Sequence, residues 1–225
     1  MKTVIITGAS RGIGLATANK FLENGWNVIG TFHTNRIPIE NSSLRAVRMD
    51  IASSVDIARA VAEMRTSISH IDVLVNNAGI NLDQKDVVAD AEKIRKILAV
   101  NVVGLIGFTE ALLPYMSSGS SIINVDSNYG AFSTPIDDET CSGYRISKAA
   151  LNMYTRELAF RLQSRGIIVS SIDPGWCKTD MGYGVSSETE KPDREPEEAA
   201  ADIYNLAVAN SESGFFWKFG KKREW

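Results

Sequence analysis

The stretch Thr3-Val4-Ile5-Ile6-Thr7-Gly8-Ala9-Ser10-Arg11-Gly12-Ile13-Gly14 decides the fold. Its β-branched start predicts a buried strand, and the apolar spacing over 13–23 predicts a helix that Gly25 ends. The glycines between them allow a sharp turn and let a pyrophosphate approach the free N–H groups of the helix N-terminus. Packing alone also places glycines in such turns. The strand–turn–helix context nevertheless favours a dinucleotide-binding motif.

Short β-branched runs and longer helical segments alternate along the rest of the chain. We expect further strands at 28–32, 44–49, 72–76, 121–125 and 167–172, with an edge strand at 215–219. Helices are expected at 55–68, 91–113, 143–165 and 196–209. Such alternation implies βαβ units with right-handed crossovers. The sequence therefore predicts an α/β fold over 1–225, a single Rossmann-type doubly wound domain with a parallel sheet of about seven strands flanked by helices.

The segment 182–198 differs from the rest in composition. It contains almost no apolar residues, so it is too polar to pack in a core. We interpret it as a mobile loop over the substrate.

Composition excludes several classes of protein. Of the 225 residues, 44% are hydrophobic and 23% charged, which excludes general disorder. Lys and Arg total 24 against 27 Asp and Glu, so nothing favours nucleic acid or an anionic membrane as partner. No stretch looks like the roughly 20 apolar residues of a membrane span. Two cysteines, Cys141 and Cys177, are too few for a disulfide framework and suit a reducing compartment, so we expect a cytoplasmic protein.

Several separate motifs follow the predicted strands in order. They are the glycine pattern Gly-x-x-x-Gly-x-Gly, Asn76-Asn77-Ala78-Gly79, Asn101-Val102-Val103-Gly104, Ser127, Tyr144-x-x-x-Lys148, and Pro174-Gly175 with Thr179. Over residues 2–181 the chain resembles the short-chain dehydrogenase/reductase family. The Trp176, Thr179-Asp180-Met181 and Ser213–Trp225 segments resemble its compact carbonyl-reductase or C-factor-like branch.

Tyr144 and Lys148 are four residues apart, so they share one face of the predicted helix. A nearby ammonium favours the phenolate of a tyrosine, which predicts Tyr144 as general acid toward a carbonyl or base toward an alcohol. Ser127 is suited to donate a hydrogen bond to the carbonyl oxygen. The plainer alternatives are a Tyr/Lys pair on an amphipathic helix and a serine that caps a turn.

The resemblance implies that Asn101 holds a water between Lys148 and solvent, and that Lys148 contacts the cofactor ribose. An interhelical hydrogen bond is the alternative for Asn101. The chain departs from the family in having Asp126 before Ser127; this carboxylate either disfavours the phenolate or points into solvent. Seventeen positions separate Ser127 from Tyr144, and we expect the extra residues around 131–140 to enlarge a loop over the substrate.

The predicted cofactor is NADP(H), with NAD(H) as the second option. An NAD site usually has an acidic residue after the second strand, and residues 31–36 contain none. Arg11 and Arg36 are suited to a 2′-phosphate; the alternative is that both are solvated. Asp50 resembles the family's adenine contact, or else caps a helix. The predicted cofactor contacts are Gly8, Ser10, Arg11, Gly12, Ile13, Gly14, His33, Arg36, Asp50, Ile51, Asn77, Ala78, Gly79, Tyr144, Lys148, Pro174, Gly175 and Thr179.

Aromatic and apolar residues follow the fifth and sixth strands, where open α/β sheets bind ligands. They predict a mainly apolar substrate pocket for a hydrophobic ketone or aldehyde, or else they pack loops: Tyr129, Phe132, Trp176, Met181 and Tyr183. His33 and His70 lack partners at ligand spacing, so no metal is expected.

The function predicted from the sequence is an NADP(H)-dependent oxidoreductase of the carbonyl-reductase type, acting on a small carbonyl or alcohol. The alternative is a catalytically weak NADP(H)-binding regulatory or signalling protein. A homodimer or homotetramer paired through helices 91–113 and 143–165 would follow the family, and a monomer stays open.

Overall fold

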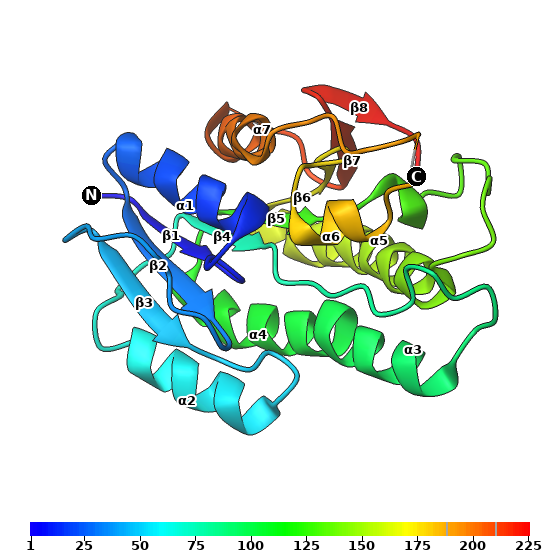
Figure 1. Ribbon diagram of the computed structural model, residues 1–225. Coiled ribbons are helices and arrows are strands. Elements are labelled where there is room, and N and C mark those ends of the chain that lie inside the picture. The colour runs from blue at the N-terminus through cyan, green and yellow to red at the C-terminus, as the bar shows by residue number, and fades with distance from the viewer. Residues whose placement is uncertain (188, 210) are drawn as a thin grey trace.

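The computed structural model describes residues 1–187, 189–209 and 211–225. In this part of the chain one eight-stranded sheet has the order β3-β2-β1-β4-β5-β6-β7-β8, which confirms the predicted doubly wound α/β fold (Figure 1). The strands are β1 (Thr3–Ile6), β2 (Asn27–Phe32), β3 (Leu44–Arg48), β4 (Val73–Asn76), β5 (Ser121–Val125), β6 (Ile168–Asp173), β7 (Phe215–Lys218) and β8 (Lys221–Arg223).

The expected edge strand is not at the edge. β7 pairs parallel with β6, and the short β8 then pairs antiparallel with β7 and takes the outer position. Its residues, Lys221–Arg223, are all basic, so they carry no alternation that would predict a strand.

Helices cover both faces of the sheet. Figure 1 shows α1 (Gly12–Glu23) and α7 (Pro196–Ala209) on one side, and α2 (Ser54–Met64), α4 (Leu105–Leu112) and α5 (Ser142–Leu162) on the other. β1 shows why two cores form, because successive strand side chains point to opposite faces. Ile5 belongs to the α2/α4/α5 core, whereas Val4 and Ile6 belong to the α1/α7 core.

The helix predicted over 91–113 is interrupted. It consists of α3 (Ala91–Leu98), a π-helical segment (Ala99–Gly104), α4, and a 3-10 turn (Leu113–Tyr115). Gly104 lies against the chain after β3, where an added Cβ would be only 1.9 Å from the Ile51 carbonyl oxygen. π-Segments often occur at functional sites, and this one contains Asn101.

The run Ala91–Tyr115 is long and apolar enough, by length and composition alone, to cross a membrane. The expectation that no stretch would look like a span is therefore wrong for this segment. In the structure, Ile97 is fully buried, and Leu105, Phe108 and Leu112 are buried in the α2/α4/α5 core. Buried core helices commonly have the same length and apolar composition, so burial in the core is enough to explain this run.

The polar segment 182–198 is partly ordered by its neighbours. Its first residues belong to α6 (Asp180–Gly184), and Arg194 forms a parallel bridge with Cys177. The Arg194 guanidinium pairs with Asp202 at 2.5 Å and donates to the Pro174 carbonyl, which ties the end of the segment to α7 and β6. Glu188 lies outside the described residues, and mobility of the segment stays a prediction.

Candidate active site

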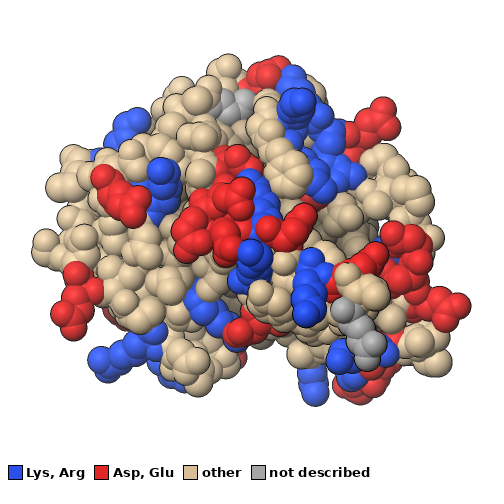
Figure 2. Space-filling model, turned by 45° about the horizontal axis from the view of Figure 1, so that its top comes forward, with Lys and Arg blue, Asp and Glu red and all other residues tan. Residues whose placement is uncertain are grey.

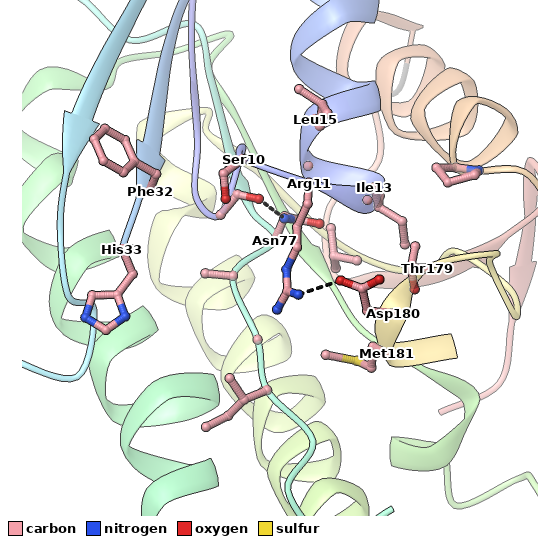
Figure 3. Close-up of a pocket in the computed structure, with 18 of the residues that line it drawn as sticks. Ser10, Arg11, Ile13, Leu15, Phe32, His33, Asn77, Thr179, Asp180 and Met181 are labelled. Carbon is pink, nitrogen blue, oxygen red and sulfur yellow. Dashed lines mark hydrogen bonds and ion pairs between the residues drawn. The ribbon is translucent and has the colours of Figure 1, made fainter. Parts of the chain in front are cut away.

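A cleft of about 820 Å³ lies at the carboxyl ends of the parallel strands (Figure 3). Most of the predicted cofactor residues line it: Gly8, Ser10, Arg11, Gly12, Ile13, Gly14, His33, Asp50, Ile51, Asn77, Ala78, Gly79, Tyr144, Lys148, Pro174 and Thr179. Arg36 is exposed and, like Gly175, is not among the lining residues. The structure thus gathers one continuous surface from six separate segments of the chain.

The glycine turn is built for close approach. Gly8 has a φ of +68°, and an added Cβ on Gly14 would be 2.2 Å from the Gly8 carbonyl oxygen. Asn77 closes the turn from β4, since its Nδ2 donates to the carbonyls of Thr7 (2.9 Å) and Gly8 (3.2 Å). Substitution of Gly14 would therefore push the strand–helix turn apart.

The N-terminus of α1 suits an anion. No side chain caps it and its first turn has no acidic residue, whereas Ser53 caps α2. The free N–H groups and the helix dipole favour a negative group here. A dinucleotide pyrophosphate fits this cradle.

Charged side chains flank the end of the cleft that is predicted to hold the adenosine. Arg11 reaches across its mouth to Asp180, with Nη1 2.6 Å from Oδ2, and Figure 3 shows the two side chains pointing toward each other. Both are highly exposed, 73% and 79%, so solvent screens the pair. His33 Nε2 lies 3.9 Å from Asp50 Oδ2. The cap of α2 is Ser53, so the capping alternative for Asp50 is wrong.

Tyr144, Ser127 and Lys148 come together at the other end of the cleft. The Ser127 hydroxyl lies close enough to the Tyr144 side chain to act on it, and its effect is to lower the pKa of Tyr144. Lys148 Nζ donates to the Val125 carbonyl at 2.7 Å and lies 5.5 Å from the centroid of the Tyr144 ring. A phenol, a hydroxyl and an amine therefore occupy one small region beside the strand ends.

Burial and charge decide the protonation of this group. Burial, followed by the nearby Asp126 and Asp173 carboxyls, raises the pKa of Tyr144 above its ordinary value. Burial likewise lowers the pKa of Lys148, against the effect of the same two carboxyls. The expected lowering of the Tyr144 pKa is therefore wrong in direction. At neutral pH Tyr144 holds its proton and is a donor.

Asp126 does not point into solvent. It is 2% exposed, and its Oδ1 accepts the backbone N–H of Ser127 at 2.8 Å. Its Oδ2 lies 3.3 Å from Ser171 Oγ. Burial raises the pKa of Asp126 to about 7. Of the two sequence-based alternatives, the structure favours the one in which this carboxyl acts on Tyr144.

The Asn101 side chain makes the interhelical contact that was one of its two interpretations. Its Nδ2 donates to the Ile80 carbonyl (2.9 Å) and to Ser147 Oγ of α5 (3.0 Å), and its Oδ1 accepts the Ile80 N–H (2.8 Å). The residue fastens the loop after β4 to α5. A role in holding water stays a prediction.

The predicted substrate residues do not converge into one apolar wall. Met181 lines the cleft, and the Tyr129 ring meets Tyr144 edge-on at 6.2 Å between centroids. Trp176 Nε1 donates to the Gly182 carbonyl at 2.8 Å, as a ring that packs a loop would. Phe132 is 87% exposed and Tyr183 is also exposed. Their part in substrate binding stays a prediction.

Two residues missed by the sequence analysis hold the Tyr129 ring that lies beside Tyr144. Asp138 accepts the Tyr129 hydroxyl at 3.1 Å and pairs with Arg145 at 2.6 Å. The Arg145 guanidinium lies 4.0 Å from the Tyr129 ring centroid, a cation–π contact. The signal available in sequence was an acidic loop directly before a helix that carries an arginine beside Tyr144.

Comparison with known proteins gives consistent results. The short chain dehydrogenase family model matches residues 2–190. A serine 3-dehydrogenase of Rhizobium radiobacter is 31% identical over 189 residues, which cover 80% of this chain and 73% of that protein.

Two solved structures of carbonyl reductases have folds similar to that of this chain. The carbonyl reductase Sniffer of D. melanogaster superposes with a TM-score of 0.87 at 26% identity and full coverage of both chains. The NADPH-bound carbonyl reductase from chicken fatty liver gives a TM-score of 0.86 at 26% identity, covering 100% of this chain and 94% of that chain.

Proposed function

The chain belongs to the short-chain dehydrogenase family of oxidoreductases, and we propose that it is an NADP(H)-dependent enzyme of the carbonyl-reductase type. The observation that carries the proposal is the meeting of Tyr144 with Ser127 and Lys148 at the end of a cleft that begins at the glycine turn. A binding protein needs the turn alone, whereas hydride transfer to a carbonyl or from an alcohol uses all three groups.

The side chains divide the work of reduction. When bound, a reduced nicotinamide would supply the hydride that the carbonyl carbon receives, and would itself be oxidised. The neutral Tyr144 gives its proton to the carbonyl oxygen, so the C=O π bond breaks as new C–H and O–H bonds form. The Ser127 hydroxyl donates a hydrogen bond to the same oxygen as negative charge develops there. Lys148, fixed by the Val125 carbonyl, stabilises the phenolate that remains.

The cofactor is assigned from the charges at the adenosine end. Arg11 lines the cleft, and the residues after β2 that line it are Thr34 and Asn35 beside His33, without a carboxylate. Arginine binds phosphate oxygens with a planar fork of donors. NADPH in the chicken carbonyl reductase and NADP in a Burkholderia cenocepacia short chain dehydrogenase support the same choice. Arg36 is not needed for this assignment.

The substrate is proposed to be a hydrophobic ketone or aldehyde. Met181 lines the cleft and the Tyr129 ring packs beside Tyr144, so apolar surface adjoins the proton donor. Preferential turnover of sugars over aryl and alkyl carbonyls would contradict this part of the proposal.

Cytoplasmic location and self-association complete the proposal. Cys141 and Cys177 are free and buried, as expected in a reducing compartment.

Ile146, Met153 and Phe160 recur every seven residues on α5 and are exposed, which offers an apolar stripe to a second copy. Acidic and basic side chains are interspersed on the face in Figure 2, so charge does not select a nucleic acid there. Light scattering on the purified protein reports the oligomeric state.

The test is NADPH oxidation with a panel of carbonyl compounds, with Tyr144→Phe as the matched variant. We expect the variant to lose about 10²–10⁴ in kcat, the usual contribution of a positioned acid. Its NADPH affinity, measured by fluorescence titration, should stay near that of the wild type because the ring is kept. Tight NADPH binding without turnover across the panel would instead indicate a regulatory protein.

Cofactor choice is tested separately with Arg11→Ser. This variant should raise KM for NADPH more than KM for NADH. Equal kcat/KM for NADPH and NADH in the wild type would remove the basis for the NADP(H) assignment.

A further inference from the structure

Asp126 is a buried carboxyl that the proposed reaction does not use. It follows β5 directly. Its side chain contacts Ser171 of β6 and the backbone N–H of Ser127. Among the described residues Asp126 forms no ion pair. Asp173, the neighbouring buried acid, differs, since it pairs with Lys218 at 2.9 Å and with Arg223 at 3.1 Å.

The hydrogen bonds around Ser171 show where the proton lies. Asn152 Nδ2 donates to the Gly130 carbonyl at 3.1 Å, and a carbonyl only accepts, so the Asn152 amide has one orientation. Its Oδ1 must then be an acceptor, and Ser171 Oγ lies 2.9 Å from it. A serine hydroxyl has a single proton, which this contact uses.

Ser171 Oγ therefore turns a lone pair toward Asp126 Oδ2, 3.3 Å away. If Asp126 were ionised, Ser171 Oγ and Asp126 Oδ2 would face each other as two hydrogen-bond acceptors with no proton between them. Such a pair is repulsive in a buried site. A proton on Oδ2 removes the conflict, because Asp126 then donates to Ser171, which donates to Asn152. The other oxygen, Oδ1, keeps its hydrogen bond from the Ser127 N–H.

The charged groups around Asp126 show what this proton does. Lys148 and Tyr144 face it from α5, and Asp173, compensated by its own two cations, faces it from β6. A carboxylate at this position would oppose the field of Lys148 and hold the Tyr144 proton more tightly. Burial raises the pKa of Asp126, in agreement with the hydrogen-bond count.

We propose that Asp126 is a positioning residue that holds a proton in the active enzyme, and that loss of this proton slows proton transfer at Tyr144. In its neutral form it orients the backbone of Ser127 and adds no negative charge of its own against the field of Lys148 on Tyr144. In its ionised form it weakens Tyr144 as an acid. This inference rests on the proposed reductase function.

Asp126→Asn is the informative variant, because an amide reproduces the neutral acid. Its oxygen can accept from the Ser127 N–H and its nitrogen can donate to Ser171, but it cannot ionise. We expect kcat/KM of the wild type to fall more between pH 6 and 9 than that of the variant. The difference should be about tenfold, which corresponds to one unit in the Tyr144 pKa. Asp126→Ser, which also lacks the carboxyl, should show the same flat profile.

Infrared spectroscopy tests the proton without relying on turnover. The wild type at pH 6 should show a protonated-carboxyl C=O band that Asp126→Asn removes and that disappears as the pH rises. The absence of such a band, or a variant whose pH profile matches the wild type, would overturn the proposal. If no carbonyl is reduced by the wild type, the reductase function fails and the role at Tyr144 fails with it, while the band still shows whether Asp126 holds a proton.

Discussion

The two faces of the sheet are packed with different chemistry. Under α1 and α7, Phe21 meets Trp26 and Tyr204 edge-on at 5.0 Å from each, within an apolar core. Under α4 and α5, Asn76 and Asn124 lie side by side on β4 and β5 and form a buried hydrogen bond of 2.9 Å. The first face offers area and shape, and the second also carries directed polar contacts.

The difference shows how one sheet provides both stability and a precise site. Asn124 Nδ2 donates to Thr155 Oγ1 of α5 at 2.8 Å, and Asn76 Nδ2 donates to Thr109 Oγ1 of α4 at 2.9 Å. These bonds fix the register of both helices on the strands that lead to the site. Apolar contacts tolerate small shifts, whereas hydrogen bonds do not.

The largest expected effect is on the apolar face. Phe21→Ala should lower the free energy of unfolding by about 3–5 kcal/mol, because it removes a fully buried ring and leaves a cavity. Urea unfolding measures this loss. Under conditions where the variant stays folded, kcat should stay within about twofold of the wild type. A large loss of kcat would show that the two faces are not separable.

The polar face should make stability depend on pH through Asp126. Its pKa is raised from 3.8 to about 7 on folding, so between these values the folded state binds more protons than the unfolded state. Stability therefore falls as pH rises through this window, by at most about 1.4 kcal/mol per pH unit for one proton. Asp126→Asn lacks this loss.

Thermal melts of wild type and Asp126→Asn from pH 4 to pH 8 measure the effect. The Tm of the variant should rise relative to that of the wild type up to about pH 7 and then level off. A constant difference in Tm across this range would mean that Asp126 titrates normally.

Asn124→Ala should lose less stability than Phe21→Ala but more activity. One N–H of Asn76 loses its acceptor and Thr155 loses its donor, at about 1–3 kcal/mol for a buried polar group left unpaired. Because Asn124 precedes the Val125 carbonyl that holds Lys148, kcat should also fall, by about tenfold. A kcat equal to that of Phe21→Ala would contradict the assigned role of the polar face.

The smallest effect is expected at the surface. Asp180→Asn breaks an exposed ion pair with Arg11, so the free energy of unfolding should change by about 0–1 kcal/mol. If Arg11 binds the 2′-phosphate, freeing it from Asp180 should lower the NADPH Kd and leave the NADH Kd unchanged. Titration with both cofactors checks this, and equal shifts would remove Arg11 from the phosphate site.

Local patterns predicted the layers of this fold well. The β-branched runs and the glycine turn predicted β1, α1 and the parallel sheet. A strand of a parallel sheet is buried on both faces, so its sequence is an unbroken apolar run. The π-segment at Asn101 was missed because it depends on the contact between Gly104 and Ile51, which are far apart in sequence.

The candidate site was predictable in its members but not in its electrostatics. Spacing along a helix placed Lys148 near Tyr144. Whether the pKa of Tyr144 is raised or lowered, however, depends on burial and on Asp126 and Asp173. Strand alternation could not tell whether Asp126 faced solvent or a packed helix. The rings chosen for the substrate pocket failed to converge for a similar reason, since a loop such as the one with Phe132 has no periodicity to orient it.

Hydride transfer from labelled cofactor tests the central claim most directly. NADPH deuterated at the transferring carbon is incubated in a single turnover with an aryl ketone and either wild type or Tyr144→Phe, and the alcohol is analysed by mass spectrometry. The account predicts deuterium on the carbinol carbon with the wild type and at least about a hundredfold slower labelling with the variant. Labelling at equal rates in both proteins, or bound NADPH with no labelled alcohol from any carbonyl, would contradict it.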